Sequence, residues 1–410
     1  MSAPIMQGPG ADVDTILVLN CGSSSVKFAL FETCGPDVPR QPSWNGKIDG
    51  IGEMAAMYRA AGSAPLALSL DGDYPYRSAI AHIRARTRER LGEASLSAIV
   101  HRVVHGGGKY LAPVRVDATI LGDLTSFVPL APLHQPFALD AIATLLDSRP
   151  QVPQFACFDT AFHQSVPRVE QLLPLPYATW ERGLRRYGFH GLSYDYLARV
   201  LPERHGDIAH GRVIVAHLGN GASLCALEGG ASVATSMGFS ALDGLMMGTR
   251  SGALDPGVLL YLLEHEGLTV AQLGRMLYRE SGLAGVSGLS SELPVLLANE
   301  DRTDAVGARV RDALALYVRR IVREVGALVA VLGGLDLLVF TAGVGENSAA
   351  IRARVCHDLG FLGIQVDDAA NQAHAPRLST SASRVAVAVE PTNEEWIAAL
   401  AAAQLLRRDR

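Results

Sequence analysis

The sequence predicts an α/β protein made of two similar halves, and two observations support this fold class. Apolar runs with strand character alternate along the 410 residues with stretches of helical periodicity. The segments 16–31 and 213–227 share one layout, in which a strand enters a small polar turn and a second strand leaves it. Because one such segment lies in each half of the chain, we expect a duplicated domain with a cleft between the halves.

The individual elements follow from residue type and periodicity. Strands are expected near residues 16–19, 26–31, 97–104, 152–158, 213–217, 223–227, 337–341 and 385–389. The clearest helix runs from Thr303 to Leu332 and stops at Gly333-Gly334, a usual C-terminal signal. Another helix begins near Asp195 and closes before Pro202, and a final amphipathic helix covers 395–408.

The first polar turn carries groups that could hold phosphate. It lies within Asn20-Cys-Gly-Ser-Ser-Ser-Val-Lys27 and offers backbone N–H groups and hydroxyls, with Lys27 as countercharge. Gly22 lets the backbone approach a ligand closely. A serine-rich hairpin turn without any ligand is the alternative for this segment alone.

Two further turns favour a nucleotide-binding protein. His217-Leu-Gly-Asn220-Gly221 joins the second pair of strands, and the strand 337–341 runs into a Gly-rich turn at 343–347 with a helix behind it. No Gly-x4-Gly-Lys-Ser/Thr loop occurs, and Gly219-Asn-Gly221 does not complete Gly-x-Gly-x-x-Gly. A dinucleotide-dependent dehydrogenase is therefore disfavoured.

Composition limits the partners and the compartment. The formal net charge of −5 gives no basic surface for nucleic acid or an anionic membrane. The longest apolar stretch, 326–341, is broken by glycines and Asp336 and is too short to span a bilayer. Five unpatterned cysteines suit reduced thiols, and residues 1–14 resemble a loose tail rather than a signal peptide. We expect a cytoplasmic protein.

Isolated polar residues stand beside Gly, Pro or strand ends, where side chains can project into a cleft. Arg102 and Arg250 have the bidentate fork that suits carboxylate and phosphate. His101 and His105 have a zinc-like spacing, but Arg102 stands where a zinc protease would carry Glu, so an inward-pointing Arg102 is favoured. The position of Asp159 is equally consistent with a helix N-cap and with a metal ligand.

These clusters together resemble the acetate kinase family over nearly the whole chain. The resemblance rests on Asn20–Lys27, Tyr187-Gly-Phe-His190-Gly, His217–Gly221, the stretch from Thr235 to Gly252, and Gly343–Asn347, in the family's order. It implies the duplicated, ribonuclease H-like ATPase fold shared with actin and sugar kinases. We expect domains at 1–160 plus 394–410 and at 161–393.

The resemblance further implies a homodimer that transfers phosphate in line and reversibly from ATP to acetate, giving acetyl phosphate and ADP. The catalytic residues it implies are Asp159, His190, Arg250, Arg102, Asn220 and His134. Asn20 and Glu394 would hold Mg²⁺, for which Mn²⁺ can substitute. The nucleotide would be bound by Lys27, Ser23, Ser25, His217, Leu218, Gly219, Asn220, Gly221, Glu292, Gly343, Val344, Gly345, Glu346 and Asn347. The acetate pocket would comprise Arg102, Val104, Leu133, Phe189 and Ala241.

The chemistry of a carboxylate acceptor fits this set. A carboxylic acid with a pKa of roughly 4 to 5 is already ionised at neutral pH, so its attack needs no general base. Asp159 is therefore better interpreted as a magnesium-site or positioning carboxylate than as a proton acceptor. Catalysis must come from in-line positioning and from neutralising the charge on the transferring phosphoryl group.

The chain departs from the family's usual pattern at four places. This chain has Ala241 where the family usually has Pro, Tyr194 where it has His, and Ala253 where it has an acidic residue. In the adenosine segment, where the family usually has Asp and Arg, this chain has Glu292 and Pro294. The first departure leaves propionate, or a broader range of short acids, as an alternative substrate. A non-catalytic nucleotide-gated binding protein of the same fold is the remaining alternative. It would not need the two arginines, and it would usually carry an appended peptide-binding domain.

Overall fold

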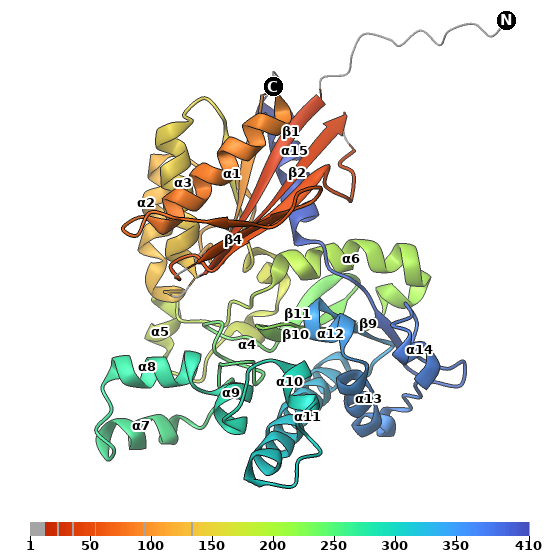
Figure 1. Ribbon diagram of the computed structural model, residues 1–410. Coiled ribbons are helices and arrows are strands. Elements are labelled where there is room, and N and C mark those ends of the chain that lie inside the picture. Colours follow the sequence, from red (N-terminus) through yellow and green to blue (C-terminus); the bar gives the residue numbers. More distant parts are fainter. Residues whose placement is uncertain are drawn as a thin grey trace, which may run out of the picture. The chain divides into compact units, whose positions relative to one another are not determined.

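The computed structural model describes residues 13–22, 24–34, 37–53, 55–92, 95–132 and 134–409. These residues form two compact units (Figure 1). The first unit takes in the described residues of Met1–Ala161 and Asn393–Arg410, and the second comprises Phe162–Thr392. Each unit has its own β-sheet with helices packed against it.

The first unit contains a mixed sheet of eight strands among the described residues, in the order β5-β4-β3-β2-β1-β6-β8-β7. Its strands are β1 (Val13–Cys21), β2 (Ser25–Cys34), β3 (Trp44–Asp49), β4 (Ala56–Ala60), β5 (Leu66–Leu68), β6 (Ala98–Val103), β7 (Val114–Arg115) and β8 (Gln154–Phe158). β1 pairs antiparallel with β2 and parallel with β6, and β6 pairs parallel with β8.

The second unit repeats this arrangement with five strands in the order β11-β10-β9-β12-β13. They are β9 (Arg212–Leu218), β10 (Ala222–Glu228), β11 (Ala231–Thr235), β12 (Leu337–Thr341) and β13 (Ala386–Val389). Here too an antiparallel hairpin is followed across the sheet by two parallel strands. The predicted α/β class is confirmed, and β3-β2-β1-β6-β8 matches β11-β10-β9-β12-β13 as a duplicated domain should.

Helices cover the first sheet because each buries an apolar face. They are α1 (Pro75–Leu91), α2 (Ala118–Ser126), α3 (Gln135–Ser148) and α15 (Glu394–Asp409). α15, predicted at 395–408, packs on β1 and β6 and buries Ile397, Ala398 and Ala402. Small alanine side chains let this helix approach the strands closely. The last segment of the chain is therefore part of the first unit.

The longest helix of the second unit has the bounds expected from its end signals. α11 spans Ala305–Leu332, Asp304 accepts a hydrogen bond from the N–H of Gly307, and Gly333 ends the helix with a φ of +69°. The other helices are α4 (Arg168–Gln171), α5 (Tyr177–Glu181), α6 (Gly191–His205), α7 (Pro256–Glu264), α8 (Val270–Arg279), α9 (Gly282–Ser287), α10 (Leu293–Leu297), α12 (Ala342–Asn347), α13 (Ala349–Asp358) and α14 (Asp368–Gln372).

The prediction for α6 was wrong at both ends. The helix starts at Gly191, directly after His190, and Pro202 lies inside its last turn rather than beyond it. Pro202 has no N–H to donate back to the fourth residue before it, but the helix continues past it, and Gly206 closes the helix by donating its N–H to the carbonyl of Pro202. Val13 and Asp14, predicted as tail, belong to β1, while residues 1–12 lie outside the described part.

No helix among the described residues is long and apolar enough to cross a membrane. The apolar stretch 326–341 contains the end of α11, a turn and the buried strand β12, as predicted.

Candidate active site

Three predicted residues of the first unit lie in one row across neighbouring strands. Asn20, near the end of β1, is in register with Lys27 of β2 and with Arg102 of β6. Residues opposite one another in a sheet project from the same face, so these three side chains share a face. Asp159 follows β8 two residues after Cys157, the register partner of Arg102, and completes the row.

Arg102 binds two carboxylates in this arrangement. Its Nε and Nη2 donate to Oδ1 and Oδ2 of Asp159 at 2.9 and 2.7 Å, and its Nη1 lies 2.7 Å from Oε2 of Glu394. The side chains of Asp159 and Glu394 are only 2% and 12% exposed. Paired geometry of this kind gives strong charge-assisted hydrogen bonds and fixes the plane of the guanidinium.

Burial and the neighbouring charges shift the pKa values of Arg102 and Glu394. Burial alone would lower the pKa of Arg102, but the carboxylates of Asp159 and Glu394 raise it above its ordinary value. Burial raises the pKa of Glu394 to about 7; the guanidinium of Arg102 opposes this shift, and the charge of Asp159 adds to it. A further positive charge near Glu394 would therefore be stabilised.

Three other predicted residues of the first unit lie at the ends of elements, and two lie outside the described residues. Ser25 starts β2 immediately after the hairpin turn, Val104 directly follows β6, and His134 is the residue before α3. Ser23 and Leu133 lie outside the described residues.

The alternative zinc reading of His101 and His105 finds no support. Nε2 of His101 bonds to Oε1 of Gln154 at 2.8 Å, and Nδ1 of His105 accepts from the N–H of Gly107. Burial lowers the pKa of both imidazoles to about 4. In the described part of the chain, no group of three or more His, Cys, Asp or Glu side chains could hold a metal ion.

In the second unit, His190 occupies a constrained position. It has a left-handed backbone conformation with a φ of 58° and directly precedes α6. Its ring stacks on that of His217 with the centroids 4.1 Å apart, and its Nδ1 lies 2.8 Å from Oγ of Ser223. A left-handed histidine is strained, and such strain often marks functional positions.

Arg250 and His190 converge above the turn between β9 and β10. A methyl group placed on Gly221 would lie 3.3 Å from Nε2 of His190 and 3.7 Å from Nη1 of Arg250. Nη1 of Arg250 also donates to the carbonyl of Ala241 at 3.0 Å. Burial lowers the pKa of Arg250 from an ordinary value so high that the group stays charged. Because Gly221 has no side chain, Nε2 of His190 and Nη1 of Arg250 both lie next to its backbone.

The remaining predicted residues of this region surround the same turn. Asn220 is exposed at its tip, and its Oδ1 would lie 2.7 Å from a Cβ on Gly248. Leu218 is the last residue of β9, and the N–H of Gly219 donates to the carbonyl of Gly221. Phe189 is buried, and its carbonyl lies 2.9 Å from Nε2 of His163.

The Gly-rich segment 343–347 was predicted as a turn, and that prediction was wrong. The residues form the short helix α12, which follows β12 immediately. Ala342 turns the chain with a φ of 64°, and Oε1 of Glu346 accepts from its N–H at 2.8 Å. Because a side chain satisfies the first backbone donor of the helix, the segment continues as a helix although glycine disfavours one.

A buried arginine of the next helix holds α12 through hydrogen bonds. Arg352 of α13 is 1% exposed and donates to the carbonyls of Gly345 and Glu346 and to the side chain of Asn371. It satisfies carbonyls at the helix end that would otherwise lack partners. Gly343 and Asn347, in contrast, are exposed.

The last predicted nucleotide residue lies on another short helix. Glu292 is exposed and is the residue before α10, which contains Pro294. Oγ of the adjacent Ser291 donates to Oε1 of Glu292 at 3.3 Å.

Comparison with known proteins identifies the family of the chain. A sequence profile of the acetokinase family matches residues 15–400. The chain belongs to the acetokinase family. The acetate kinase of Nitrobacter hamburgensis is 47% identical over 396 residues, which cover 94% of this chain and 95% of the relative. The acetate kinase of Rhodopseudomonas palustris is 46% identical over 391 residues, with 94% and 97% covered.

Solved structures of acetokinase relatives have the same fold. A propionate kinase from Francisella tularensis superposes with a TM-score of 0.87 at 33% identity, covering 95% of this chain and 98% of the other. The acetate kinase of Porphyromonas gingivalis gives a TM-score of 0.82 at 36% identity, with 96% and 100% covered. The predicted actin-like ATPase fold is thereby confirmed.

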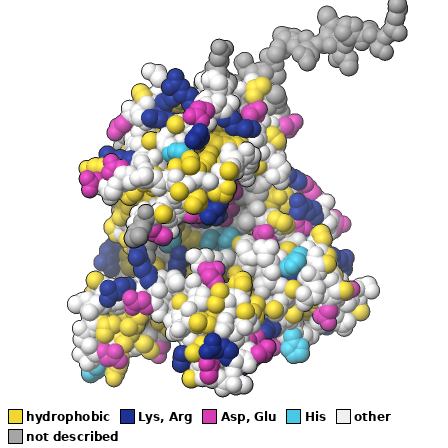
Figure 2. All heavy atoms as spheres, in the orientation of Figure 1, with side chains coloured by type: hydrophobic (Ala, Val, Ile, Leu, Met, Phe, Trp, Pro, Cys, Tyr) yellow, Lys and Arg dark blue, Asp and Glu magenta, His cyan; other side chains and the backbone are white. Residues whose placement is uncertain are grey.

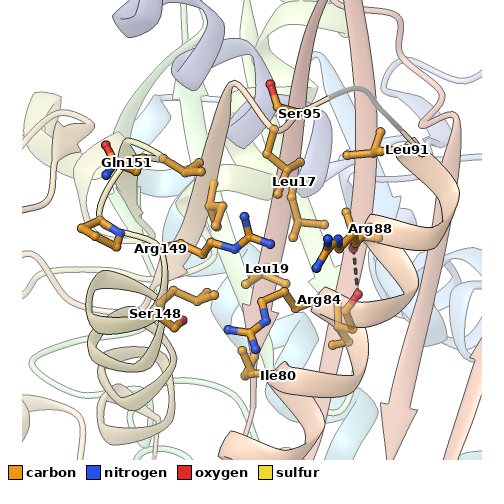
Figure 3. A pocket seen from close by; sticks show the side chains of 18 residues that line it. Leu17, Leu19, Ile80, Arg84, Arg88, Leu91, Ser95, Ser148, Arg149 and Gln151 are labelled. Carbon is orange, nitrogen blue, oxygen red and sulfur yellow. Dashed lines mark hydrogen bonds between the residues drawn. The ribbon is translucent and has the colours of Figure 1, made fainter.

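A separate apolar cavity lies away from the predicted residues (Figure 3). It has a volume of about 550 Å³ and is lined by α1, α3 and β1, with Leu17 and Leu19 on its floor. The guanidinium groups of Arg84, Arg88 and Arg149 point into it. None of the acetokinase motif residues of the first unit lines this cavity, so its size is no guide to the chemistry.

Sequence reasoning missed two serines that hold the stacked histidines. Oγ of Ser223 lies 2.8 Å from Nδ1 of His190, and Oγ of Ser193 lies 2.9 Å from Nδ1 of His217. Both serines are fully buried. A polar residue inside an apolar strand was the available signal at Ser223. Nothing local distinguished Ser193, because its partner lies 24 residues away.

Proposed function

We propose that the chain catalyses reversible phosphoryl transfer from ATP to acetate, giving acetyl phosphate and ADP. Its membership of the acetokinase family and the acetate kinases that resemble it over nearly their whole length support this proposal. The observation that carries it is the convergence of Nε2 of His190 and Nη1 of Arg250 over Gly221. An imidazole nitrogen and a guanidinium close to one point can supply the hydrogen bonds and the positive charge that a transferring phosphoryl group requires.

Charge neutralisation and positioning account for the proposed chemistry. The acetate carboxylate is ionised at neutral pH and attacks phosphorus directly, so no residue needs to accept a proton. His190, Asn220 and Arg250 supply hydrogen bonds or charge to the phosphoryl oxygens. Arg102 binds the acyl carboxylate or the phosphoryl group, and Asp159 holds its guanidinium plane. These contacts gain strength as negative charge spreads over the phosphoryl oxygens.

The donor set near Arg102 fits a magnesium ion. Mg²⁺ prefers oxygen ligands and binds through one or two carboxylates. Glu394 and Asn20 offer a carboxylate and an amide oxygen, and burial together with Asp159 raises the pKa of Glu394 to about 7, which favours a nearby cation. Bound there, Mg²⁺ or Mn²⁺ would neutralise phosphate charge. In that role Glu394 and Asn20 only bind and orient.

The metal assignment has its own test. Glu394→Ala should raise the Mg²⁺ concentration needed for half-maximal activity, with partial rescue at high metal. Glu53→Ala, at an exposed residue outside the motifs, is the control. An unchanged metal titration would move the ligand to another residue, such as neighbouring Glu395.

Trapping the product tests the reaction itself. The protein is incubated with ATP, Mg²⁺, hydroxylamine and acetate, propionate or butyrate, because hydroxylamine converts an acyl phosphate into a hydroxamate. Added ferric ion then turns the hydroxamate into a coloured complex. We expect acid-dependent hydroxamate and an equal amount of ADP. ADP release without hydroxamate from any acid would contradict the proposal and would favour a nucleotide-gated binding protein.

Propionate is the second candidate substrate. The likeness to the propionate kinase of Francisella tularensis and the small side chain of Ala241 both favour it. Residues that bind the nucleotide phosphates would be the same for either acid, since the two substrates differ by one methylene.

We further infer that two copies of the chain associate. α7 has no buried residue although its sequence is Pro-Gly-Val-Leu-Leu-Tyr-Leu-Leu-Glu. Val258, Leu260 and Tyr261 are 46%, 56% and 56% exposed, and Figure 2 shows hydrophobic side chains gathered over this helix at the lower left. Covering such a face with a second copy would remove apolar area from water.

A further inference from the structure

A chain of three polar side chains runs from the interior of the second unit to His190. Tyr194 of α6 is fully buried, and its hydroxyl lies 2.5 Å from Oγ of Ser223 on β10. The same Oγ lies 2.8 Å from Nδ1 of His190. Ser223 therefore contacts both residues at once, and it too is fully buried.

The positions of the hydrogens follow from counting donors and acceptors. If the tyrosine donates to serine and the serine donates to Nδ1, the hydroxyl hydrogens of both Tyr194 and Ser223 have acceptors. In the opposite direction, Nδ1–H donates to serine and serine donates to tyrosine, which leaves the buried tyrosine hydrogen without an acceptor. An unsatisfied buried donor costs roughly 1–3 kcal/mol, so the first direction is favoured.

We propose that Ser223, oriented by Tyr194, is a positioning residue that fixes His190 as the tautomer with its proton on Nε2. Nε2 is the atom that lies near Gly221 and Nη1 of Arg250. His190 thus presents a hydrogen-bond donor, rather than a lone pair, at the point where the phosphoryl group is proposed to bind. This inference rests on the proposed function for its catalytic consequence only.

The neighbouring groups hold the ring of His190 in a fixed orientation. His217 stacks on His190 and is itself held through Nδ1 by Ser193, which precedes Tyr194 in α6. Arg250 brings a positive charge close to Nε2. The two stacked rings, 4.1 Å apart, are thus each held through Nδ1 by a buried serine, and Ser193 and Tyr194 in the first turn of α6 act on both.

Two variants separate positioning from packing. Ser223→Ala removes the donor to Nδ1 and also leaves the tyrosine hydroxyl without its acceptor, so both turnover and melting temperature should fall. Adding Tyr194→Phe removes that orphaned hydroxyl. The double variant should recover much of the lost melting temperature but not the turnover, because the donor to Nδ1 is still missing.

The kinetic and spectroscopic readouts are specific. We expect Ser223→Ala and the double variant to lose at least about tenfold in kcat, with KM for acetate changed less. Nitrogen NMR of protein labelled in histidine rings, with His190→Gln to assign the signal, should show Nε2–H in the wild type and loss of that single tautomer in Ser223→Ala. Tyr317→Phe is the matched control, since its buried hydroxyl has no hydrogen-bond partner among the described residues.

Two results would overturn the inference. One is a wild-type His190 protonated on Nδ1, and the other is recovery of kcat together with stability in the double variant. Failure of the proposed function looks different: the wild type would form no acyl phosphate from any tested acid, while the tautomer would still be measurable in the resting protein.

Discussion

Arg102 pairs with two carboxylates in the first unit, and removing it should cost stability as well as activity. Asp159 and Glu394 are nearly buried and both bind its guanidinium. Arg102→Ala leaves two carboxylates without that partner, so we expect the free energy of unfolding to fall by about 2 kcal/mol, less than for a fully buried pair because Arg102 is partly exposed. Urea denaturation measures this.

Arg115 provides the matched control for that stability prediction. It pairs with Asp409 at 3.0 Å, but the two side chains are 61% and 43% exposed. Exposed pairs contribute little, so Arg115→Ala should change the unfolding midpoint only slightly. If the two variants lost equal free energy of unfolding, burial of Arg102 with its two carboxylates would not add to stability.

Ala241 should decide how long an acid the protein accepts. A proline at this position would add two ring carbons, and one buried methylene is worth roughly 0.8 kcal/mol. We expect propionate to be used within about tenfold of acetate in kcat/KM, with butyrate much poorer, and Ala241→Pro to shift preference toward acetate. Measuring kcat/KM for three acids in both proteins checks this; rejection of propionate by about a hundredfold in the parent would contradict it.

At the scale of elements, a side chain at Gly221, in the turn between β9 and β10, would be crowded by His190. A Cβ on Gly221 would sit 3.3 Å from Nε2 of His190, which forces that ring to shift. We expect Gly221→Ala to lower turnover at least about tenfold while the melting temperature stays nearly unchanged. If the Gly221→Ala variant kept the wild-type turnover, His190 and Arg250 would not bind the phosphoryl group beside Gly221.

Gly274 is the control for the same substitution elsewhere in the second unit. It lies inside α8, and a Cβ there meets nothing within 4 Å. Alanine is favoured over glycine within a helix by roughly 0.5–1 kcal/mol. Gly274→Ala should therefore keep full activity and slightly raise the melting temperature.

Elements with one dominant local cause were predictable from the sequence, and others were not. The apolar runs of β1, β2, β9, β10 and β12 and the end signals of α11 gave nearly correct positions. β3, with burial alternating along Trp44–Asp49, and the short strands β4, β5, β7 and β11 were missed. Their residues become strands because a neighbouring strand offers backbone partners, which is not a local property.

In the candidate site, too, some features could be predicted from the sequence and others could not. Arg102 and Asp159 could be singled out because Gly, Pro or a strand end adjoins each charged residue, but their mutual hydrogen bonds join positions 57 residues apart. The helix α12 was mistaken for a turn because its glycines dominated the pattern, while the contacts of Glu346 and Arg352 that stabilise it depend on the folded chain.

At the scale of the whole molecule, α7 should decide the oligomeric state. Leu260 is 56% exposed, so Leu260→Asp should leave the fold intact while placing a charge in the proposed contact between copies. Sedimentation velocity should show a dimer for the wild type and a monomer for Leu260→Asp. Val169→Asp, at a 75% exposed residue of α4, is the control and should remain dimeric. A monomeric wild type would contradict the association.

The central claim, that two arginines support phosphoryl transfer to a carboxylate, is tested most directly by acetate-dependent turnover in Arg102→Ala and Arg250→Ala. Each substitution removes a charge-assisted contact that strengthens in the transition state, and such a contact typically contributes roughly 3 kcal/mol or more. With circular dichroism confirming folded protein, we predict a rate at least about a hundredfold below wild type for each variant. A variant that retains more than about a tenth of the wild-type rate with acetate would contradict the role proposed for that arginine.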